Sequence, residues 1–345
     1  MKRRMESQIK RAIKIRRNEK PNDYDGNLTK VISTGSTLLD LAITGGRIRG
    51  GGIPGEIMVI AYGPSGTGKT VLACEVAGAI MRQGGEIKYR DSEARLNKTF
   101  ASLFDLDVDE IDHTQPNTIS ETFKDLYKWE PDEESINGYI IDSLAALSTD
   151  LEMDNDDGDK MGMKRAKEFS AVLRKCARLI ADKNIILFCT NQIRENADAG
   201  LYQRKDVNPG GKAIEFYSSL ILRFTSFSKI KKEVLVKGKT VRRIVGISGT
   251  IEVDKSSVWK PHHTAPITIF FDYGIDDIRE NLVYVKKYKG LSTYCVNGES
   301  LGQSLEKAII RVEENELEGV LKEEVIDLWE EIESKFKSDR KQKQR

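Results

Sequence analysis

The sequence is poor in cysteine and lacks the spacing that disulfide or zinc sites require. Its 345 residues include four cysteines, which lie far apart and form no CxxC or Cys/His ligand pattern. We therefore expect reduced thiols and a fold that depends on neither a disulfide nor zinc. The four residues are Cys74, Cys176, Cys189 and Cys295.

Long apolar runs and an excess of charge of one sign are also missing. No apolar run approaches the ~18 residues of a membrane span, and the Lys/Arg-rich N-terminus is not followed by the apolar stretch of a signal peptide. We therefore expect a cytoplasmic protein that has no membrane partner. The 55 Lys and Arg balance the 54 Asp and Glu, so any nucleic-acid binding has to come from local basic patches.

The chain does contain a long alternation of strand-like apolar runs and helical stretches. This alternation predicts an α/β fold in which a mostly parallel sheet is flanked by helices. With 39% hydrophobic residues, the chain is able to bury a substantial core. The runs with strand character are 56–62, 86–90, 138–141, 185–190 and 220–224.

The two ends of the chain differ from this middle part. The first 20 or so residues place apolar side chains at helical spacing opposite Lys and Arg, which favours a short docking helix; a solvated basic tail is the alternative. We expect an N-terminal helix and linker over 1–32 and an α/β core over 33–275. A small α/β domain over 276–345 would end in an amphipathic helix, 314–336, and a basic tail.

The segment 63–70, GPSGTGKT, fits the GxxxxGK[ST] pattern of a phosphate-binding loop, or P-loop. A predicted strand precedes it and a helix-compatible run follows it, which argues against a mere glycine-rich turn. Its glycines let backbone N–H groups approach phosphate, Lys69 would meet the β and γ phosphates, and the Thr70 hydroxyl would ligate Mg²⁺. The expected nucleotide-binding residues of this loop are Gly63, Pro64, Ser65, Gly66, Thr67, Gly68, Lys69, Thr70 and Val71.

Two carboxylates follow other predicted strands. Asp142 comes directly after the apolar run 138–141 and would hold Mg²⁺ together with Thr70; taken alone, such an Asp is also common at helix caps. Glu93 follows the strand 86–90, where a carboxylate is able to reach a water aligned on the γ phosphate, so it is the candidate general base. A solvated loop carboxylate is the alternative for Glu93.

Six further segments surround these motifs: 33–42 (STGSTLLDLA), 89–94 (YRDSEA), 141–147 (IDSLAAL), 190–194 (TNQIR), 209–217 (PGGKAIEFY) and 293–303 (TYCVNGESLGQ). Together they resemble the RecA family of recombinases. The similarity covers nearly the whole chain, in the family's order and at nearly its spacing. The final segment is similar to the C-terminal domain of bacterial RecA, so the bacterial and phage branch fits best, and departures from the family pattern suggest a phage- or plasmid-borne relative.

This resemblance implies an ATP-dependent DNA recombinase with a RecA-type ATPase core. It would form a helical filament of identical subunits on single-stranded DNA, pair that strand with homologous double-stranded DNA, and hydrolyse ATP with Mg²⁺ when DNA is bound. Gln192 would sense the γ phosphate and act in catalysis with Lys69 and Glu93. The main rival is a RecA-core ATPase of another class, such as a hexameric helicase or a signalling ATPase. A further alternative is a mediator protein that binds DNA but only senses ATP. The presence of Lys69, Glu93 and Gln192 argues against it.

The resemblance also places two DNA-binding loops, near 154–164 and 195–208. Arginine forks and exposed N–H groups bind phosphate without reading bases, although ordinary surface charge is the alternative for each arginine. The residue after Arg194 departs from the family, because Glu195 replaces an apolar residue that would wedge between bases. The implied DNA contacts are Met161, Gly162, Ser170, Arg174, Arg194, Gly210 and Gly211.

Two further nucleotide contacts are implied less directly. Phe100 falls where the family stacks an aromatic ring on adenine, with a core phenylalanine as the alternative. Lys255 resembles a lysine that reaches the ATP bound by the neighbouring subunit. Ser257 stands where the family has a second lysine, however, so the alignment at Lys255 is open.

The stretch 229–243 has no counterpart in the family. It reads as a basic hairpin that turns around Lys237-Gly238-Lys239. Two interpretations stay open: an altered site for the incoming duplex, or a plain solvated hairpin.

Overall fold

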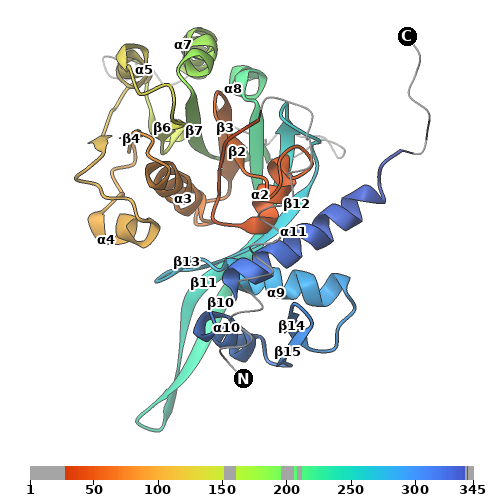
Figure 1. Cartoon of the computed structure of the whole chain (residues 1–345). Coiled ribbons are helices and arrows are strands. Elements are labelled where there is room, and N and C mark those ends of the chain that lie inside the picture. The colour runs from red at the N-terminus through yellow and green to blue at the C-terminus, as the bar shows by residue number, and fades with distance from the viewer. Residues whose placement is uncertain (1–27, 151–160, 196–205, 208–211, 339, 341–345) are drawn as a thin grey trace.

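The computed structural model describes residues 28–150, 161–195, 206–207, 212–338 and 340. Its central element is a nine-stranded sheet of order β13-β12-β11-β10-β3-β7-β6-β4-β5 (Figure 1). The strands from β10 to β5 in this order run parallel, and β11, β12 and β13 extend the sheet in antiparallel fashion. The prediction of a mostly parallel α/β sheet is therefore confirmed.

The five predicted strand runs correspond to β3, β4, β6, β7 and β10. The sheet consists of β3 Met58–Gly63, β4 Ile87–Arg90, β5 Asp112–Thr114, β6 Asn137–Ile141, β7 Ile185–Gln192, β10 Leu220–Val236, β11 Lys239–Ser256, β12 Thr264–Phe270 and β13 Gly274–Ile275. Three short pairs stand apart from it: β1 Val31–Ile32 with β2 Ile53–Pro54, β8 Arg194–Glu195 with β9 Asp206–Val207, and β14 Tyr294–Val296 with β15 Glu299–Gly302.

Helices cover both faces of the parallel part of the sheet. Because successive strand residues point to opposite faces, Val59 and Ala61 join the apolar cluster under α3, whereas Met58 and Ile60 join the one under α5 and α7. The helices are α2 Thr37–Thr44, α3 Lys69–Arg82, α4 Lys98–Ala101, α5 Ile119–Lys128, α7 Met161–Asp182, α8 Lys212–Tyr217, α9 Asp277–Tyr288, α10 Leu305–Glu314 and α11 Glu318–Ser334, with 3-10 turns η1 Ser102–Phe104 and η2 Leu144–Ala146.

The elements after β13 form a small module of three helices and the β14–β15 hairpin. Its apolar side chains join the same buried cluster as α2 and the outer strands of the sheet, so the module packs on the core rather than standing apart. The predicted helix over 314–336 is wrong at its start. Asn315 closes α10 and Glu316 adopts a left-handed conformation (φ 53°), so the final helix begins only at Glu318.

Some expectations fall on parts of the chain that the structure does not describe. The predicted helix over residues 1–20 lies outside the described residues, as do most positions of the basic tail. Among the helices that are described, none is long and apolar enough to cross a membrane. All four cysteines are buried free thiols.

Candidate ATP site and DNA-binding loops

The P-loop joins the buried strand β3 to helix α3, as its sequence context predicts. Gly66 and Gly68 have φ angles of 73° and 90°, in the left-handed region that favours glycine. A Cβ atom at Gly68 would also lie 2.3 Å from the Cδ1 atom of Ile269 on β12. The left-handed backbone therefore favours glycine at this position, and the Ile269 side chain would have to move to admit a larger residue.

Lys69 turns back into the loop at the first residue of α3. Its Nζ donates to the carbonyl oxygens of Gly63 at 3.1 Å and Pro64 at 2.6 Å, and the residue is only 8% exposed. Burial lowers the pKa of Lys69, while the nearby carboxylates of Asp142 and Glu93 act in the opposite direction. An ammonium has three N–H donors, so one donor is left over from these carbonyls for a phosphate oxygen.

Asp142 stands at the carboxyl end of β6 and is 7% exposed. Thr190 donates a hydrogen bond to its Oδ1, the Tyr89 hydroxyl donates to its Oδ2 at 3.3 Å, and Thr70 also bonds the carboxylate. Burial raises the pKa of Asp142 despite these hydrogen bonds. A buried carboxylate next to a threonine hydroxyl is the oxygen donor set that suits Mg²⁺ beside a phosphate.

Glu93 is held against two neighbouring strand ends. Its Oε1 accepts from the Ser143 hydroxyl at 2.6 Å and from Nε2 of Gln192 at 3.1 Å. Arg95 forms an ion pair with the other oxygen at 2.9 Å, and the Glu93 side chain is 16% exposed. This placement favours a positioned site carboxylate over a solvated one.

Gln192 is the last residue of β7 and pairs in register with Gly63 of the P-loop. The next backbone N–H, that of Ile193, donates to the Gly63 carbonyl at 3.3 Å. Immediately afterwards Arg194 and Glu195 form β8, which pairs with β9. The candidate γ-phosphate sensor is thus two residues away from the stem of the second predicted DNA loop, whose interior lies outside the described residues.

The first predicted DNA loop leads into α7. Met161 and Gly162 are the first residues of this helix, and farther along it Ser170 is half-buried and Arg174 is exposed. Residues 154–160 of this loop lie outside the described range. Arg165 fastens the start of α7 to the turn after Asp142 by donating to the carbonyls of Leu144 at 2.7 Å and Ala145 at 2.9 Å.

The structure does not bring every predicted contact together. The Phe100 ring packs edge-on against Phe104, with centroids 5.2 Å apart, and lies half-buried against the main core, so adenine stacking stays a prediction beside the core alternative. The Lys255 Nζ donates to the carbonyls of Glu215 at 2.6 Å and Phe216 at 3.1 Å, at the end of α8 in the same chain. Gly210 and Gly211 lie outside the described residues, and Arg194 is placed only by its backbone in β8.

Sequence reasoning missed the buried ion network next to this site. Arg90, on β4, is 2% exposed and makes a two-pronged contact to Asp112 with both distances at 3.0 Å. It also pairs with Asp125 and donates to the Tyr139 hydroxyl at 3.2 Å. Two cations, Lys88 and Arg90, on one strand of a sheet expected to be covered by helices were the available signal, because a buried charge requires partners.

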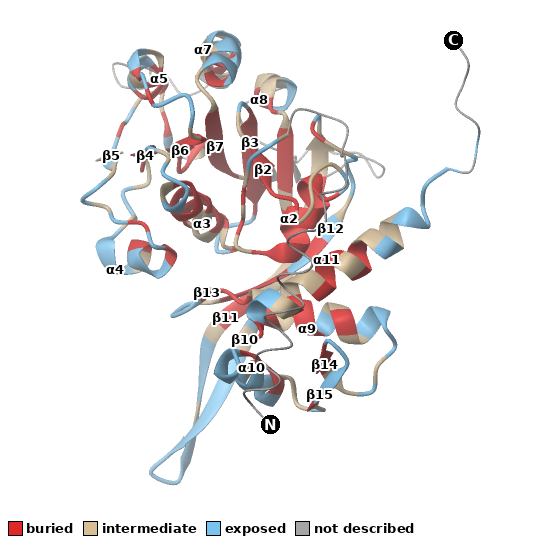
Figure 2. Ribbon diagram, in the orientation of Figure 1, coloured by how far each residue is buried: buried red, intermediate tan, exposed pale blue. Residues whose placement is uncertain are grey.

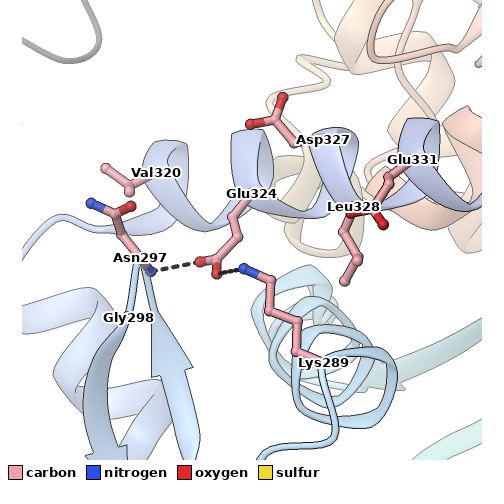
Figure 3. A pocket seen from close by; sticks show the side chains of 8 residues that line it. All are labelled: Lys289, Asn297, Gly298, Val320, Glu324, Asp327, Leu328 and Glu331. Atoms are coloured by element: carbon pink, nitrogen blue, oxygen red, sulfur yellow. Dashed lines mark hydrogen bonds and ion pairs between the residues drawn. The ribbon is translucent and has the colours of Figure 1, made fainter.

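A hollow in the C-terminal module does not suit a nucleotide (Figure 3). Three carboxylates, Glu324, Asp327 and Glu331, line it beside the single cation Lys289. Glu324 is already engaged, since it accepts from Lys289 Nζ and from the backbone N–H of Asn297, both at 2.6 Å. Excess negative charge repels phosphate, and Glu324 links α11 to the β14–β15 turn through its hydrogen bond from Asn297.

Comparison with known proteins gives one matching family model and many similar curated proteins. A family model described as the RecA N-terminal domain matches residues 16–276. Protein RecA of Acholeplasma laidlawii (strain PG-8A) is 30% identical over 286 residues, 81% of either chain, and Protein RecA of Lactobacillus delbrueckii subsp. bulgaricus is 30% identical over 288 residues, 82% of either chain. Protein RecA of Synechocystis sp. is 29% identical over 292 residues, 83% of this chain. The chain therefore belongs to the RecA family of ATP-dependent DNA recombinases.

Proposed function

We propose that this recombinase couples its grip on single-stranded DNA to ATP through the contact between Glu93 and Gln192. Lys69 would bind the β and γ phosphates, and Thr70 with Asp142 would hold Mg²⁺, which neutralises phosphate charge during hydrolysis. Glu93 would accept a proton from the attacking water. The donor set described above fits both ATP and Mg²⁺.

The observation that carries this proposal is the 3.1 Å hydrogen bond from the Gln192 amide to Glu93. A phosphate oxygen is a competing acceptor for this amide, and accepting the bond would free Glu93 to act on water. Because β8 begins two residues later, a shift of Gln192 is passed directly to the stem of the second DNA loop. Such a loop, ordered by a phosphate contact and released afterwards, is a known type of nucleotide switch.

We assign the DNA contacts to the two loops and to α7, in a helical filament of identical subunits. The exposed Arg174 and the start of α7 would bind phosphates of the single strand, together with Arg194, Gly210 and Gly211. The arrangement also supports a core over 33–275 and a C-terminal domain over 276–345, since β13, the last strand of the large sheet, ends at Ile275. Lys255 is kept as a candidate contact to the neighbouring subunit's ATP.

Two substitutions test the coupling. In Glu93→Gln, ATP hydrolysis in the presence of single-stranded DNA should fall roughly 100-fold or more, because a general base contributes about 10²–10⁴, while ATP-dependent filaments persist. In Lys69→Ala, nucleotide-dependent DNA binding itself should be lost. Glu110→Gln, which changes an exposed carboxylate, is the matched control.

Hydrolysis rates and electron microscopy on single-stranded DNA read out both effects. Unchanged hydrolysis in Glu93→Gln would remove Glu93 from the role of base. Closed six-membered rings in place of helical filaments would favour the helicase alternative over the recombinase.

A further inference from the structure

One cation beside the proposed ATP site has no role in it so far: Arg95, which follows the candidate base Glu93 by two residues. Its Nη1 lies 2.9 Å from Oε2 of Glu93, and its side chain is 71% exposed. The strand β4 is buried apart from the half-buried Lys88, whereas the chain from Ser92 to the start of α4 is half-buried or exposed (Figure 2). Arg95 therefore reaches a carboxylate of the site from the protein surface.

The backbone on both sides of Arg95 is fixed, so the fold sets its place beside Glu93. Ala94 has a φ of 53°, a left-handed conformation that is uncommon for a residue with a Cβ atom. The buried Asp91 accepts two backbone hydrogen bonds, through its carbonyl from Ala94 at 3.2 Å and through its carboxylate from Leu96 at 2.8 Å. These contacts close a tight turn, which brings Arg95 back onto the residue two positions before it.

The two oxygens of the Glu93 carboxylate are engaged differently. Oε1 accepts from the Ser143 hydroxyl and from the Gln192 amide. Oε2 accepts from neither, so it is the oxygen open to an attacking water, and Arg95 occupies it. The N–H donor of Arg95 competes with the O–H donor of that water, because each takes a lone-pair site of the same carboxylate.

A purely structural role does not account for this ion pair. Arg95 and Glu93 belong to one turn that the hydrogen bonds of Asp91 already close, so the pair joins no separate elements. Arg90 is the contrasting case, because its side chain is 3% exposed and ties β4 to Asp112 on β5. An ion pair with a 71% exposed arginine is weak and easily exchanged, which suits a restraint that opens at each turnover.

We propose that Arg95 is a positioning residue that restrains Glu93 while no DNA is bound, and so sets how strongly hydrolysis depends on DNA. This inference rests on the proposed function, in which the Gln192 amide leaves Glu93 for the γ phosphate as the DNA loop becomes ordered. Oε1 then accepts the proton of the water, whose oxygen bonds to the γ phosphorus while ADP leaves with the electron pair of the broken P–O bond. Arg95 stays on Oε2 and holds the carboxylate in place. Without DNA both oxygens are engaged, and hydrolysis has to wait until the exposed ion pair opens.

Steady-state ATP hydrolysis by the full-length protein, with and without single-stranded DNA, tests this role in Arg95→Gln. Hydrolysis without DNA should rise about threefold to fivefold, the range that one exposed ion pair is able to supply. Hydrolysis with saturating DNA should change little, so the stimulation by DNA should fall by nearly the same factor. KM for ATP should stay the same, because Arg95 acts on Glu93 and not on the nucleotide.

Three matched variants separate the charge of Arg95 from other effects. Arg95→Lys keeps a cation within reach of Oε2 and should restore most of the restraint. Arg82→Gln removes an arginine from another surface ion pair, with Asp105 at 2.7 Å, and should hydrolyse ATP like the parent. In the Glu93→Gln background, Arg95→Gln should not raise hydrolysis, because the carboxylate on which it acts is gone.

An unchanged rate without DNA in Arg95→Gln would overturn the proposal. A loss of hydrolysis both with and without DNA, or a higher KM for ATP, would overturn it as well, since Arg95 would then act on the fold or on the nucleotide itself. A rise that persists in the Glu93→Gln background shows that Arg95 does not act through Glu93. Glu93→Gln alone tells the two proposals apart: parent-like turnover there refutes the proposed function, whereas lost turnover there beside an unchanged Arg95→Gln refutes the restraint alone.

Discussion

Among the cations near the ATP site, Arg90 should be the one whose removal lowers the free energy of unfolding the most. In Arg90→Met an unbranched apolar side chain replaces a guanidinium that is buried between Asp112, Asp125 and the Tyr139 ring. The two carboxylates would lose their strongest partner at the edge of the sheet. We therefore expect a destabilised protein whose β4 end, three residues before Glu93, is held less firmly.

The magnitude follows from the exposure of the partners. Removing one member of a buried ion pair costs about 3–5 kcal/mol, and the Arg90 side chain is only 3% exposed. The carboxylates of Asp112 and Asp125 are 43% and 37% exposed, however, and both keep Lys88 as a partner. Solvent and Lys88 recover part of the loss, so we expect the free energy of unfolding to fall by about 2 kcal/mol.

Urea unfolding of the full chain, compared with Arg82→Met, measures this loss. Arg82 pairs with Asp105 on the surface, where the side chains are 45% and 72% exposed, so its removal should cost at most about 1 kcal/mol. If the two variants lose the same free energy of unfolding, burial does not explain how much the Arg90 network contributes to stability.

The acid limb of the stability profile gives a second measure of the same network. Burial alone would raise the pKa of Asp112, but hydrogen bonds from Arg90 and Lys88 outweigh it and lower the pKa from 3.8 to about 2. The stabilisation is therefore present above pH 4 and is lost as the pH falls towards 2. Such a change in pKa is worth roughly 2.4 kcal/mol for a buried group and about 1 kcal/mol after solvent screening. Between pH 4 and pH 2, Arg90→Met should therefore lose less free energy of unfolding than the parent, because it lacks one of the donors that lower the pKa of Asp112.

Three further substitutions probe the surroundings of the site. Thr190→Val removes the hydroxyl that holds Asp142 and should raise the Mg²⁺ concentration needed for half-maximal hydrolysis several-fold; an unchanged Mg²⁺ titration would contradict this. Burial raises the pKa of Asp40 from 3.8 to about 6, so stability contributed by its protonated form should decline as the pH rises from 4 to 6, by up to about 3 kcal/mol. Thermal unfolding across that range should give a flatter profile for Asp40→Asn. Arg165→Met frees the start of α7 from the Leu144 carbonyl and should lower the stimulation of hydrolysis by DNA while basal hydrolysis stays the same.

The edge of the parallel sheet could be anticipated from the sequence. Apolar runs that end in Asp142 or Gln192 predict strands whose carboxyl ends meet at one edge, and ligands bind there in open α/β sheets. Gln192 does lie opposite Gly63, and its amide does reach Glu93. The role of the P-loop glycines could also be predicted, because a left-handed backbone next to the start of a helix favours glycine.

Contacts between strands that are distant in the chain could not be anticipated in the same way. Periodicity predicts that a segment is a strand but not which strand lies beside it. Arg90 finds Asp112 only because β5 pairs with β4, and Lys255 reaches α8 only because β11 pairs with β10. The break at Glu316 also escaped prediction, since apolar residues on both sides continue a helical pattern and only the left-handed backbone interrupts it.

The β10–β11 hairpin changes how the near-neutral charge of this chain should be understood. Residues 229–244 contain seven cations and one glutamate, a net charge of +6 in a chain whose total is +1, so the remaining residues together carry a net charge of −5. A net acidic body repels a polyanion at long range, and such repulsion extends about 10 Å at 0.1 M salt. The charge of the whole chain is therefore a poor guide to its affinity for nucleic acid, because its cations and its carboxylates are concentrated in different parts of the sequence.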